Sequence, residues 1–368
     1  DAWYLETSFR LFSALKAGPL AFARAYTEAF RIKAPLIALV PFPLYALFGL
    51  GERIAVWANL PLAALAAWSW SRAASCWWRE HPRGKDAAAL AGALTALLPM
   101  AYGLSRFFFV ETLLSALLGL WAWRCAAARP DDRREGLKLG LILGLGLLTK
   151  STFPLLAAGF AWPARKCLRP HAGRALAVGG LVAATWYAAN LPYVAGFAWS
   201  AGFGSVAKDY AGRGGLAARW GWLAAIAQSG LSWPVAAAMA AVAAAAVSKP
   251  KADEGTRAAL WGLAPLLVYA AGANREPRLV APLLPVAALL AARAAISFHR
   301  AAARAAAAAA LLGAGLAVCA DQTFRAGPDR ALAFNGAPIM NRGWDREALV
   351  NAAAAVVVGR DGTVAEPK

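Results

Sequence analysis

Long apolar stretches, separated by short segments that carry clustered basic residues, run through most of this chain. Of its 368 residues, 60% are hydrophobic and 16% are charged, and the mean hydropathy is +0.49. A soluble domain of this size would not be so apolar, whereas a protein with many membrane crossings is. The sequence therefore predicts an all-α polytopic membrane protein.

Ten apolar runs are long enough to be candidate membrane spans. The run at 35–49 contains three prolines and corresponds to about 22 Å of helix, which is shorter than a hydrocarbon core of about 30 Å. We expect a broken or re-entrant piece there, and the sequence does not decide whether it crosses. The ten runs are 35–49, 54–76, 87–104, 107–123, 137–164, 175–191, 221–247, 258–273, 279–297 and 303–320.

The net charge of +18 comes from 38 Lys and Arg against 20 Asp and Glu. On a soluble chain this excess would suggest nucleic acid, but here the basic residues lie in short loops between apolar runs, and we expect no nucleic-acid partner. Basic loops favour the cytoplasmic side, so we predict an integral protein of the plasma (inner) membrane. If 35–49 crossed completely, strict alternation would place Arg79 to Lys85 outside, against its charge.

Three regions follow from these patterns. Residues 1–34 are expected to form an outer loop with amphipathic interfacial helices, in which Leu5, Phe9 and Phe12 recur at helical spacing before a break at Gly18. Residues 35–320 would form the transmembrane helical domain. Residues 321–368 would form an extracytoplasmic C-terminal segment, the start of an incomplete α/β domain with a helix at 344–354 and a strand at 355–358. Because the sequence begins with Asp1, we expect a piece of a longer protein.

A lysine interrupts the Gly-rich apolar run at 137–164. A charge at membrane depth costs about 2.5 to 3.5 kcal/mol even on lenient scales, so Lys150 is a candidate functional residue that faces a cavity or a partner. The alternative is a helix end whose ammonium group reaches the interface. Because Pro154 and another apolar stretch follow, we expect two short helices with Lys150 near their apex on the outer side.

Six motifs resemble, in order, those of GT-C membrane glycosyltransferases, in the branch of protein O-mannosyltransferases and lipid A aminoarabinose transferases. The resemblance spans roughly residues 1 to 290. The motifs are Asp1-Ala-Trp-Tyr4, Lys33-Ala-Pro-Leu36, Ser105-Arg-Phe-Phe-Phe-Val-Glu-Thr-Leu-Leu114, the helix from Gly140 to Lys150, Thr185-Trp-Tyr-Ala-Ala-Asn190 and Arg278-Leu-Val-Ala-Pro-Leu-Leu-Pro285.

The resemblance implies a GT-C-like helical bundle and an activity. Such an enzyme would transfer a sugar from a polyprenyl-phosphate donor to an acceptor hydroxyl on the extracytoplasmic face, with inversion. The acceptor can be a lipid, a glycan or a protein, and the sequence identifies neither the acceptor nor the sugar. Ala2, Ala34 and Leu279 depart from the family pattern, and all three histidines lie in predicted cytoplasmic loops. Metal dependence therefore stays open. If the protein uses a divalent cation, Asp1 and Glu111 would bind it.

Five residues are candidates for the chemistry itself. Asp1 and Glu111 are the candidate catalytic carboxylates, with Asp1 as general base, and Lys33, Lys150 and Arg278 would bind the donor phosphate. The alternatives are a flexible chain end for Asp1 and a helix-end anchor for Arg278, a role that Arg275 fits equally well. For Glu111 the alternative is a structural salt bridge with Arg106.

A second group of residues would contact the substrates: Tyr4, Arg106, Trp186, Tyr187 and Asn190. The aromatic members fit an interfacial belt equally well. The Gly-rich segment from Gly196 to Arg219 would be a loop that either closes over the acceptor or merely connects helices.

Two other classes compete with the enzyme. A transporter or lipid flippase would also place charges at membrane depth, but such proteins usually contain two related halves, and no internal repeat is evident. A membrane scaffold would leave Lys33, Glu111 and Lys150 without a role.

Overall fold

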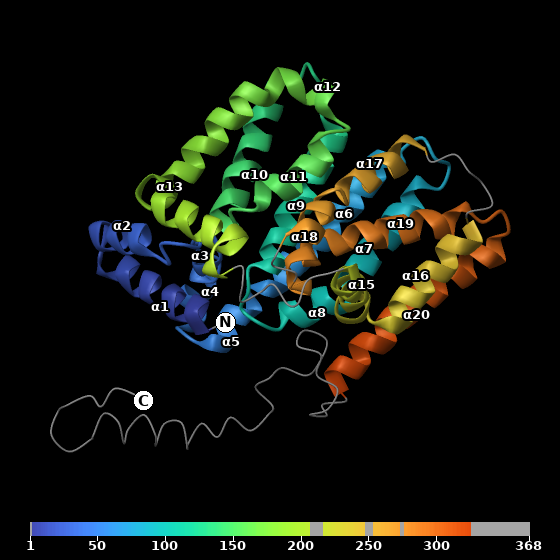
Figure 1. Cartoon of the computed structure of the whole chain (residues 1–368), viewed down its shortest axis with the longest axis horizontal. Coiled ribbons are helices and arrows are strands. Elements are labelled where there is room, and N and C mark those ends of the chain that lie inside the picture. The colour runs from blue at the N-terminus through green and yellow to red at the C-terminus, as the bar shows by residue number, and fades with distance from the viewer. Residues whose placement is uncertain (1, 207–215, 247–252, 273–275, 325–368) are drawn as a thin grey trace.

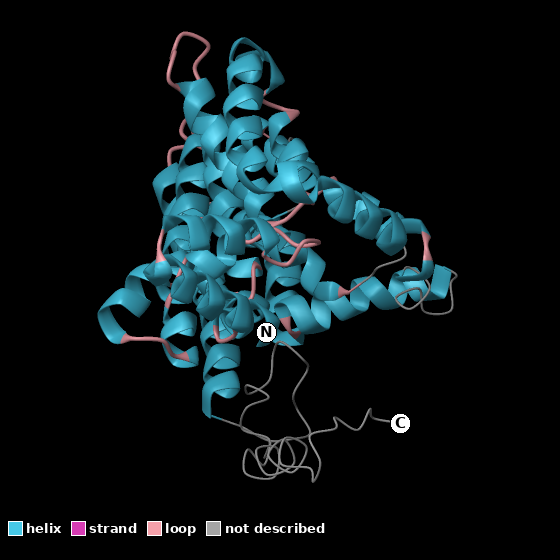
Figure 2. Ribbon diagram, turned by 90° about the vertical axis from the view of Figure 1, so that its left-hand side faces the viewer, coloured by secondary structure: helices cyan, strands magenta, loops and turns pink. Residues whose placement is uncertain are grey.

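The computed structural model describes residues 2–206, 216–246, 253–272 and 276–324. These residues form helices joined by short loops, and none of them forms a strand (Figures 1 and 2). The predicted all-α fold is confirmed. The helix predicted at 344–354 and the strand at 355–358 lie outside the described residues.

The chain begins with the two helices that the spacing predicts. α1 (Ala2–Ala17) and α2 (Pro19–Glu28) are separated by Gly18, whose φ of 129° lies in a region that side chains disfavour. Leu5 and Phe12 are buried against the rest of the protein, so the apolar face of α1 packs on the bundle.

The proline-rich run is broken, as expected. It forms α3 (Leu36–Leu39) and α4 (Phe42–Phe48), which lead through α5 (Glu52–Trp57) into α6 (Asn59–Trp77). The chain bends by 117° between Leu36–Phe48 and Glu52–Trp77. Each proline lacks a backbone donor and restricts the residue before it, which favours short helices over one continuous helix.

The centre of the bundle is α9 (Glu111–Ala127), which packs against α6, while α7 (Gly84–Ala96) packs against both α6 and α19 (Leu284–Ser297). α9 carries apolar residues on all of its faces, and most of its side chains are buried. Between α7 and α9 lies α8 (Pro99–Ser105), bent by 52° from α7.

The run containing Lys150 forms two helices, α10 (Glu135–Thr149) and α11 (Phe153–Ala161), with Lys150 between them, which confirms the predicted break. α10 packs beside the long α13 (Ala172–Phe203) (Figure 1). A Cβ added at Gly140 or Gly144 would lie 2.7 Å or 2.5 Å from the Cβ of Val178 or Val182. Both contacts advance by four residues on each helix, so α10 and α13 run parallel at close approach.

The remaining helices complete the bundle, and α16 lies beside α20 (Figure 1). They are α12 (Arg165–Leu168), η1 (Arg169–His171), α15 (Leu216–Ala225), η2 (Ile226–Leu231), α16 (Trp233–Ala246), α17 (Glu254–Gly262), α18 (Pro265–Ala271), η3 (Pro277–Leu283) and α20 (Ala301–Phe324).

One predicted boundary is wrong. We expected the apolar span to end at residue 191 and a loop to begin at Gly196, but α13 continues through Pro192 to Phe203. Pro192 removes only one backbone donor, and the apolar residues that follow favour continuation of the helix. Residues 207–215 of that predicted loop lie outside the described residues.

Within the described part of the chain, three helices are long and apolar enough to cross a bilayer: Arg165–Ala201, Pro277–Ser297 and Ala301–Phe324. The number rises to six if each of three bent pairs is one span. The ten predicted runs exceed this number because several are interrupted. The run at 258–273, for example, divides into α17 and α18 near Pro265.

Candidate active site

Glu111 and Lys150 meet at one end of a helical hairpin. Glu111 is the first residue of α9, and Lys150 directly follows α10. The two helices are antiparallel and of similar length, about 26 and 22 Å, so the start of one reaches the end of the other. Oε1 of Glu111 lies 3.5 Å from the Nζ of Lys150.

Arg278 approaches the same carboxylate from another part of the chain. Its Nε lies 3.6 Å from Oε1 of Glu111, and its guanidinium carbon lies 4.9 Å from the centre of the Phe109 ring. Glu276 also pairs with Arg278, with Oε1 and Oε2 each 3.1 Å from a guanidinium nitrogen. Glu111 is 3% exposed and faces two cations, which offset part of the cost of burying its charge.

Lys33 is a third cation, close enough to interact electrostatically with Glu111, Lys150 and Arg278. Its Nζ lies 4.7 Å from the ring centre of Trp3 and 5.5 Å from that of Tyr4. Burial lowers the pKa of Lys33, and the positive charges of Arg278 and Lys150 lower it further. The carboxylates of Glu111 and Glu276 offset this repulsion in part, so the five side chains keep one net positive charge, which favours a further anion such as a phosphate.

Tyr4 lies between these groups. Its ring packs edge-on against Phe30 and Phe109, at centroid distances of 5.4 and 6.3 Å. Burial raises the pKa of Tyr4, and the negative charge of Glu111 adds to this effect. The hydroxyl therefore stays protonated and can donate a hydrogen bond to a substrate.

The backbone turn before Lys33 is strained and anchored. Phe30 and Arg31 have φ of 57° and 56°, a left-handed conformation that costs about 1 to 3 kcal/mol per residue without glycine. Trp186 donates from Nε1 to the backbone oxygen of Ala29 at 3.1 Å, and Asn190 donates from Nδ2 to that of Thr27 at 2.7 Å. These bonds from α13 hold the turn in place.

The remaining predicted residues have other partners. Arg106 donates to the backbone oxygen of Gln322 at 2.9 Å and lies over the Tyr102 ring. Among the described residues Glu111 pairs with Lys150 and Arg278, and the predicted alternative, a salt bridge with Arg106, is not formed. Tyr187 donates to the backbone oxygen of Leu147 at 3.1 Å. The predicted substrate contacts of Trp186, Tyr187 and Asn190 stay predictions, and Asp1 lies outside the described residues.

Three residues that contact the cations of the site were not predicted from the sequence: Trp3, Phe109 and Glu276. Trp3 and Phe109 each cover a cation, and Glu276 shares Arg278 with Glu111. The aromatic run just before Glu111 and the acid two positions before Arg278 were visible signals.

The described residues do not fit a metal ion at this site. No group of three or more His, Cys, Asp or Glu side chains that could hold one occurs among them. In addition, Lys150 and Arg278 already neutralise Glu111 and would repel a divalent cation. The proposed partner carboxylate, Asp1, lies outside the described range.

No family model and no curated protein matches this sequence. Two solved structures are similar in fold, both of ArnT from Cupriavidus metallidurans. The structure bound to undecaprenyl phosphate has a TM-score of 0.53, and the alignment covers 73% of this chain and 50% of that one. The apo structure has a TM-score of 0.54 and coverages of 80% and 54%. Identity is 19% in both.

The chain thus spans about half the length of the ArnT structures. Over the aligned part it has the same helical fold as these structures, which agrees with the fold that the sequence motifs implied. At this identity, the likeness concerns the fold, and the chemistry has to be argued from the site.

Proposed function

We propose that this protein is an integral membrane glycosyltransferase that transfers a sugar from a polyprenyl-phosphate donor to an acceptor hydroxyl on the extracytoplasmic face. One observation carries the proposal: Lys33, Lys150 and Arg278, from three distant parts of the chain, gather around Glu111 at one end of a buried hairpin. Glu111 and Glu276 balance two of the three positive charges, and the one that remains in a membrane fold favours a further anionic partner.

The partner that fits is a lipid-linked phosphate. Lysine ammonium groups act as point charges, and a guanidinium binds two phosphate oxygens in one plane. One of the ArnT structures of the same fold is bound to undecaprenyl phosphate, which supports this choice of ligand. The phosphate would lie among the three cations, with its polyprenyl chain in the bilayer.

These cations would act on the leaving group. As the acceptor oxygen attacks the anomeric carbon, the bond from that carbon to the phosphate oxygen breaks, and its electrons leave with the phosphate. Lys33, Lys150 and Arg278 would stabilise the charge that develops on the departing phosphate. Attack from the opposite face inverts the configuration of the anomeric carbon.

Two carboxylates have different parts in this proposal. Asp1 would accept the proton of the acceptor hydroxyl. Glu111 is buried and already paired with Lys150 and Arg278, which fits a positioning role for the two cations. The acceptor remains a lipid, a glycan or a protein hydroxyl, and the protein would reside in the plasma (inner) membrane.

Transfer of radiolabelled sugar by membranes containing the full-length protein tests the proposal. A panel of polyprenyl-phosphate sugars would be offered, and we expect a glycosidic product that is lost in Lys150→Met. Arg79→Gln, a change at an exposed residue far along the chain from the site, is the matched control and should leave transfer unchanged.

Two outcomes would overturn the proposal. Movement of a solute or lipid across the bilayer without a glycosidic product would favour the transporter class instead. Equal transfer by the wild type and Lys150→Met would remove the cation cluster from the reaction. The anomeric configuration of the product tests whether transfer proceeds with inversion. Loss of transfer in Asp1→Asn would support Asp1 as the general base. Transfer assays in sealed vesicles of each orientation test whether the reaction takes place on the extracytoplasmic face.

A further inference from the structure

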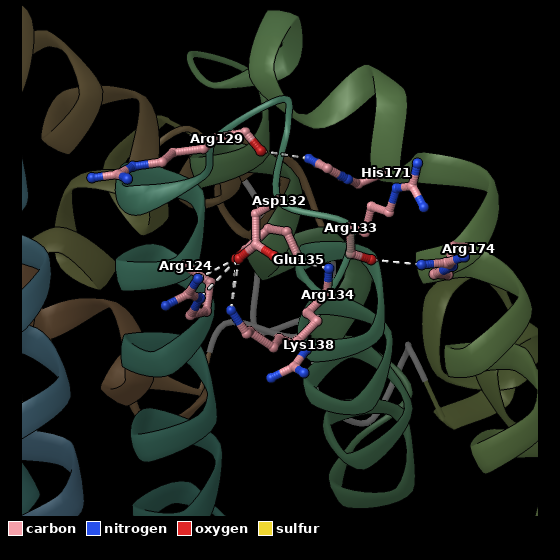
Figure 3. Close-up of polar contacts among 9 residues, drawn as sticks. All are labelled: Arg124, Arg129, Asp132, Arg133, Arg134, Glu135, Lys138, His171 and Arg174. Atoms are coloured by element: carbon pink, nitrogen blue, oxygen red, sulfur yellow. Dashed lines mark hydrogen bonds and ion pairs between the residues drawn. The ribbon is translucent and has the colours of Figure 1, made fainter.

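A basic crevice lies at the other end of the α9–α10 hairpin, where α9 ends and α10 begins. Its volume is about 360 Å³, and it opens between the loop that joins these helices and the start of α13. The residues around it come from the α9–α10 loop and the adjoining helix ends, from η1 and from the first turn of α13 (Figure 3). The crevice is lined by Pro130, Asp131, Arg133, Pro170, His171 and Arg174.

Two lining arginines, Arg133 and Arg174, are exposed and have no carboxylate partner among the described residues. Arg174 donates from its guanidinium to the backbone oxygen of Arg133 at 2.5 Å (Figure 3). That bond uses one of five guanidinium donors and neutralises no charge. Both arginines therefore keep a full positive charge beside the crevice.

Nearby acids do not compensate for these charges, because they are paired elsewhere. Glu135 binds Arg124 through both carboxylate oxygens, and Asp132 lies 2.9 Å from the Nζ of Lys138 (Figure 3). Only Asp131 remains at the crevice, where it is exposed.

The walls of the crevice are held in place. His171 is 6% exposed, and its Nε2 donates to the backbone oxygen of Arg129 at 2.8 Å, which joins the α9–α10 loop to the start of α13 (Figure 3). This hydrogen bond fixes the position of the loop relative to the start of α13, on either side of the crevice.

The surroundings of the crevice favour an anion that is part of a lipid. Along α10 and α13, exposed leucines follow directly after the charged residues: Leu137 and Leu141 on α10 are 46% and 43% exposed, and Leu176 on α13 is 65% exposed. In a membrane fold, a change from arginine to exposed leucine over one or two helical turns marks the boundary between headgroups and acyl chains. The exposed leucines therefore favour a lipid headgroup over a soluble anion as the ligand of the crevice.

We propose that this crevice binds the phosphodiester headgroup of an anionic phospholipid, with Arg133 and Arg174 as its ligands and the acyl chains along the exposed leucines. Basic pockets between membrane helices bind anionic headgroups in this way. This site is separate from the Glu111 cluster and does not depend on the proposed transferase activity.

Native mass spectrometry of the full chain in detergent, titrated with phosphatidylglycerol or phosphatidylcholine, tests the proposal. We expect preferential binding of phosphatidylglycerol, weakened by on the order of 10- to 30-fold in Arg133→Gln/Arg174→Gln, because each basic residue contributes about a factor of five. Asp131→Asn should tighten binding by removing the one repelling carboxylate.

The matched control is Arg79→Gln/Arg300→Gln, which removes the same charge from exposed arginines that do not line the crevice. Equal weakening by the control pair would show general attraction to anionic lipid and would overturn the proposal. Displacement of the lipid by millimolar inorganic phosphate would also overturn it, in favour of a soluble anion. Should the double variant fail to fold, Arg133→Gln alone gives the same comparison, since its side chain is solvent-exposed.

Discussion

The ammonium of Lys150 lies 3.5 Å from Oε1 of Glu111, and this pair connects the end of α10 to the start of α9. Arg278 reaches the same oxygen at 3.6 Å, so one buried carboxylate organises two cations. The other carboxylate oxygen is buried and has no hydrogen-bond partner among the described residues.

Glu111→Gln removes the charge that holds the two cations and keeps the shape of the side chain. We expect loss of stability by about 1 to 3 kcal/mol, less than for a fully buried pair because Lys150 and Arg278 are 20% and 25% exposed. Sugar transfer should fall at least tenfold. Thermal unfolding in detergent and the transfer assay measure the two effects, and unchanged values in both would show that Glu111 organises nothing.

Glu276→Gln should tighten binding of the donor. In the structure the carboxylate of Glu276 pairs with two guanidinium nitrogens of Arg278, with oxygen–nitrogen distances of 3.1 Å. A phosphate bound by Arg278 would need the same N–H donors. Removing this competitor should lower the Kd for polyprenyl phosphate several-fold, as measured by titration calorimetry. Glu28→Gln, at an exposed residue of α2, is the control. Weaker donor binding in Glu276→Gln would mean that Glu276 supports the site and does not compete.

Donor binding should weaken on the alkaline side because of Lys33. Burial, together with the charges of Arg278 and Lys150, lowers the pKa of this amine, so it loses its proton at lower pH than a free lysine does. Only the protonated form attracts phosphate, and affinity should therefore be full at low pH and fall as the pH rises through the lowered pKa. In Lys33→Arg the alkaline loss should disappear, because a guanidinium stays charged. Identical pH profiles of Kd would exclude this role.

Gly146→Ala should disturb the turn that carries Lys150. A Cβ at Gly146 would lie 2.2 Å from Cδ1 of Phe153, a fully buried ring at the start of α11. We expect a loss of about 1 to 3 kcal/mol from overpacking and weaker donor binding. Gly180→Ala in α13 is the matched control, since nothing lies within 4 Å of its added Cβ and alanine favours a helix by up to about 1 kcal/mol. Equal stability of the two variants would contradict the close contact.

The Arg124–Glu135 pair should fix the register of the α9–α10 hairpin from its other end. Glu135 is 1% exposed and binds Arg124 and Lys138. Glu135→Ala should cost about 3 kcal/mol, because it leaves a partly buried guanidinium without its partner. A double-mutant cycle with Arg124→Met, followed by thermal unfolding, should give a coupling energy above about 1 kcal/mol. Additive effects would show that the pair contributes no coupling.

The break at Lys150 was predictable because its signals are local. A charge interrupts an apolar run, and a proline follows four residues later, so a helix end is favoured whatever the rest of the chain does. The break at Gly18 is of the same kind. The extent of α13 was misjudged, because Pro192 suggested an end that the apolar residues beyond it overrode.

The contacts among the charged residues, in contrast, could not be predicted from local signals. By itself, the sequence determined a helical membrane protein and selected Lys33, Glu111, Lys150 and Arg278 as unusual, since hydropathy and helix-breaking residues act over a few turns. Only the tertiary structure decided that Arg278 and Lys150 share one carboxylate, that Glu276 also pairs with Arg278, and that Trp186 and Asn190 hold the turn before Lys33. These contacts depend on how helices distant in sequence pack and in which register, and no local pattern specifies that geometry.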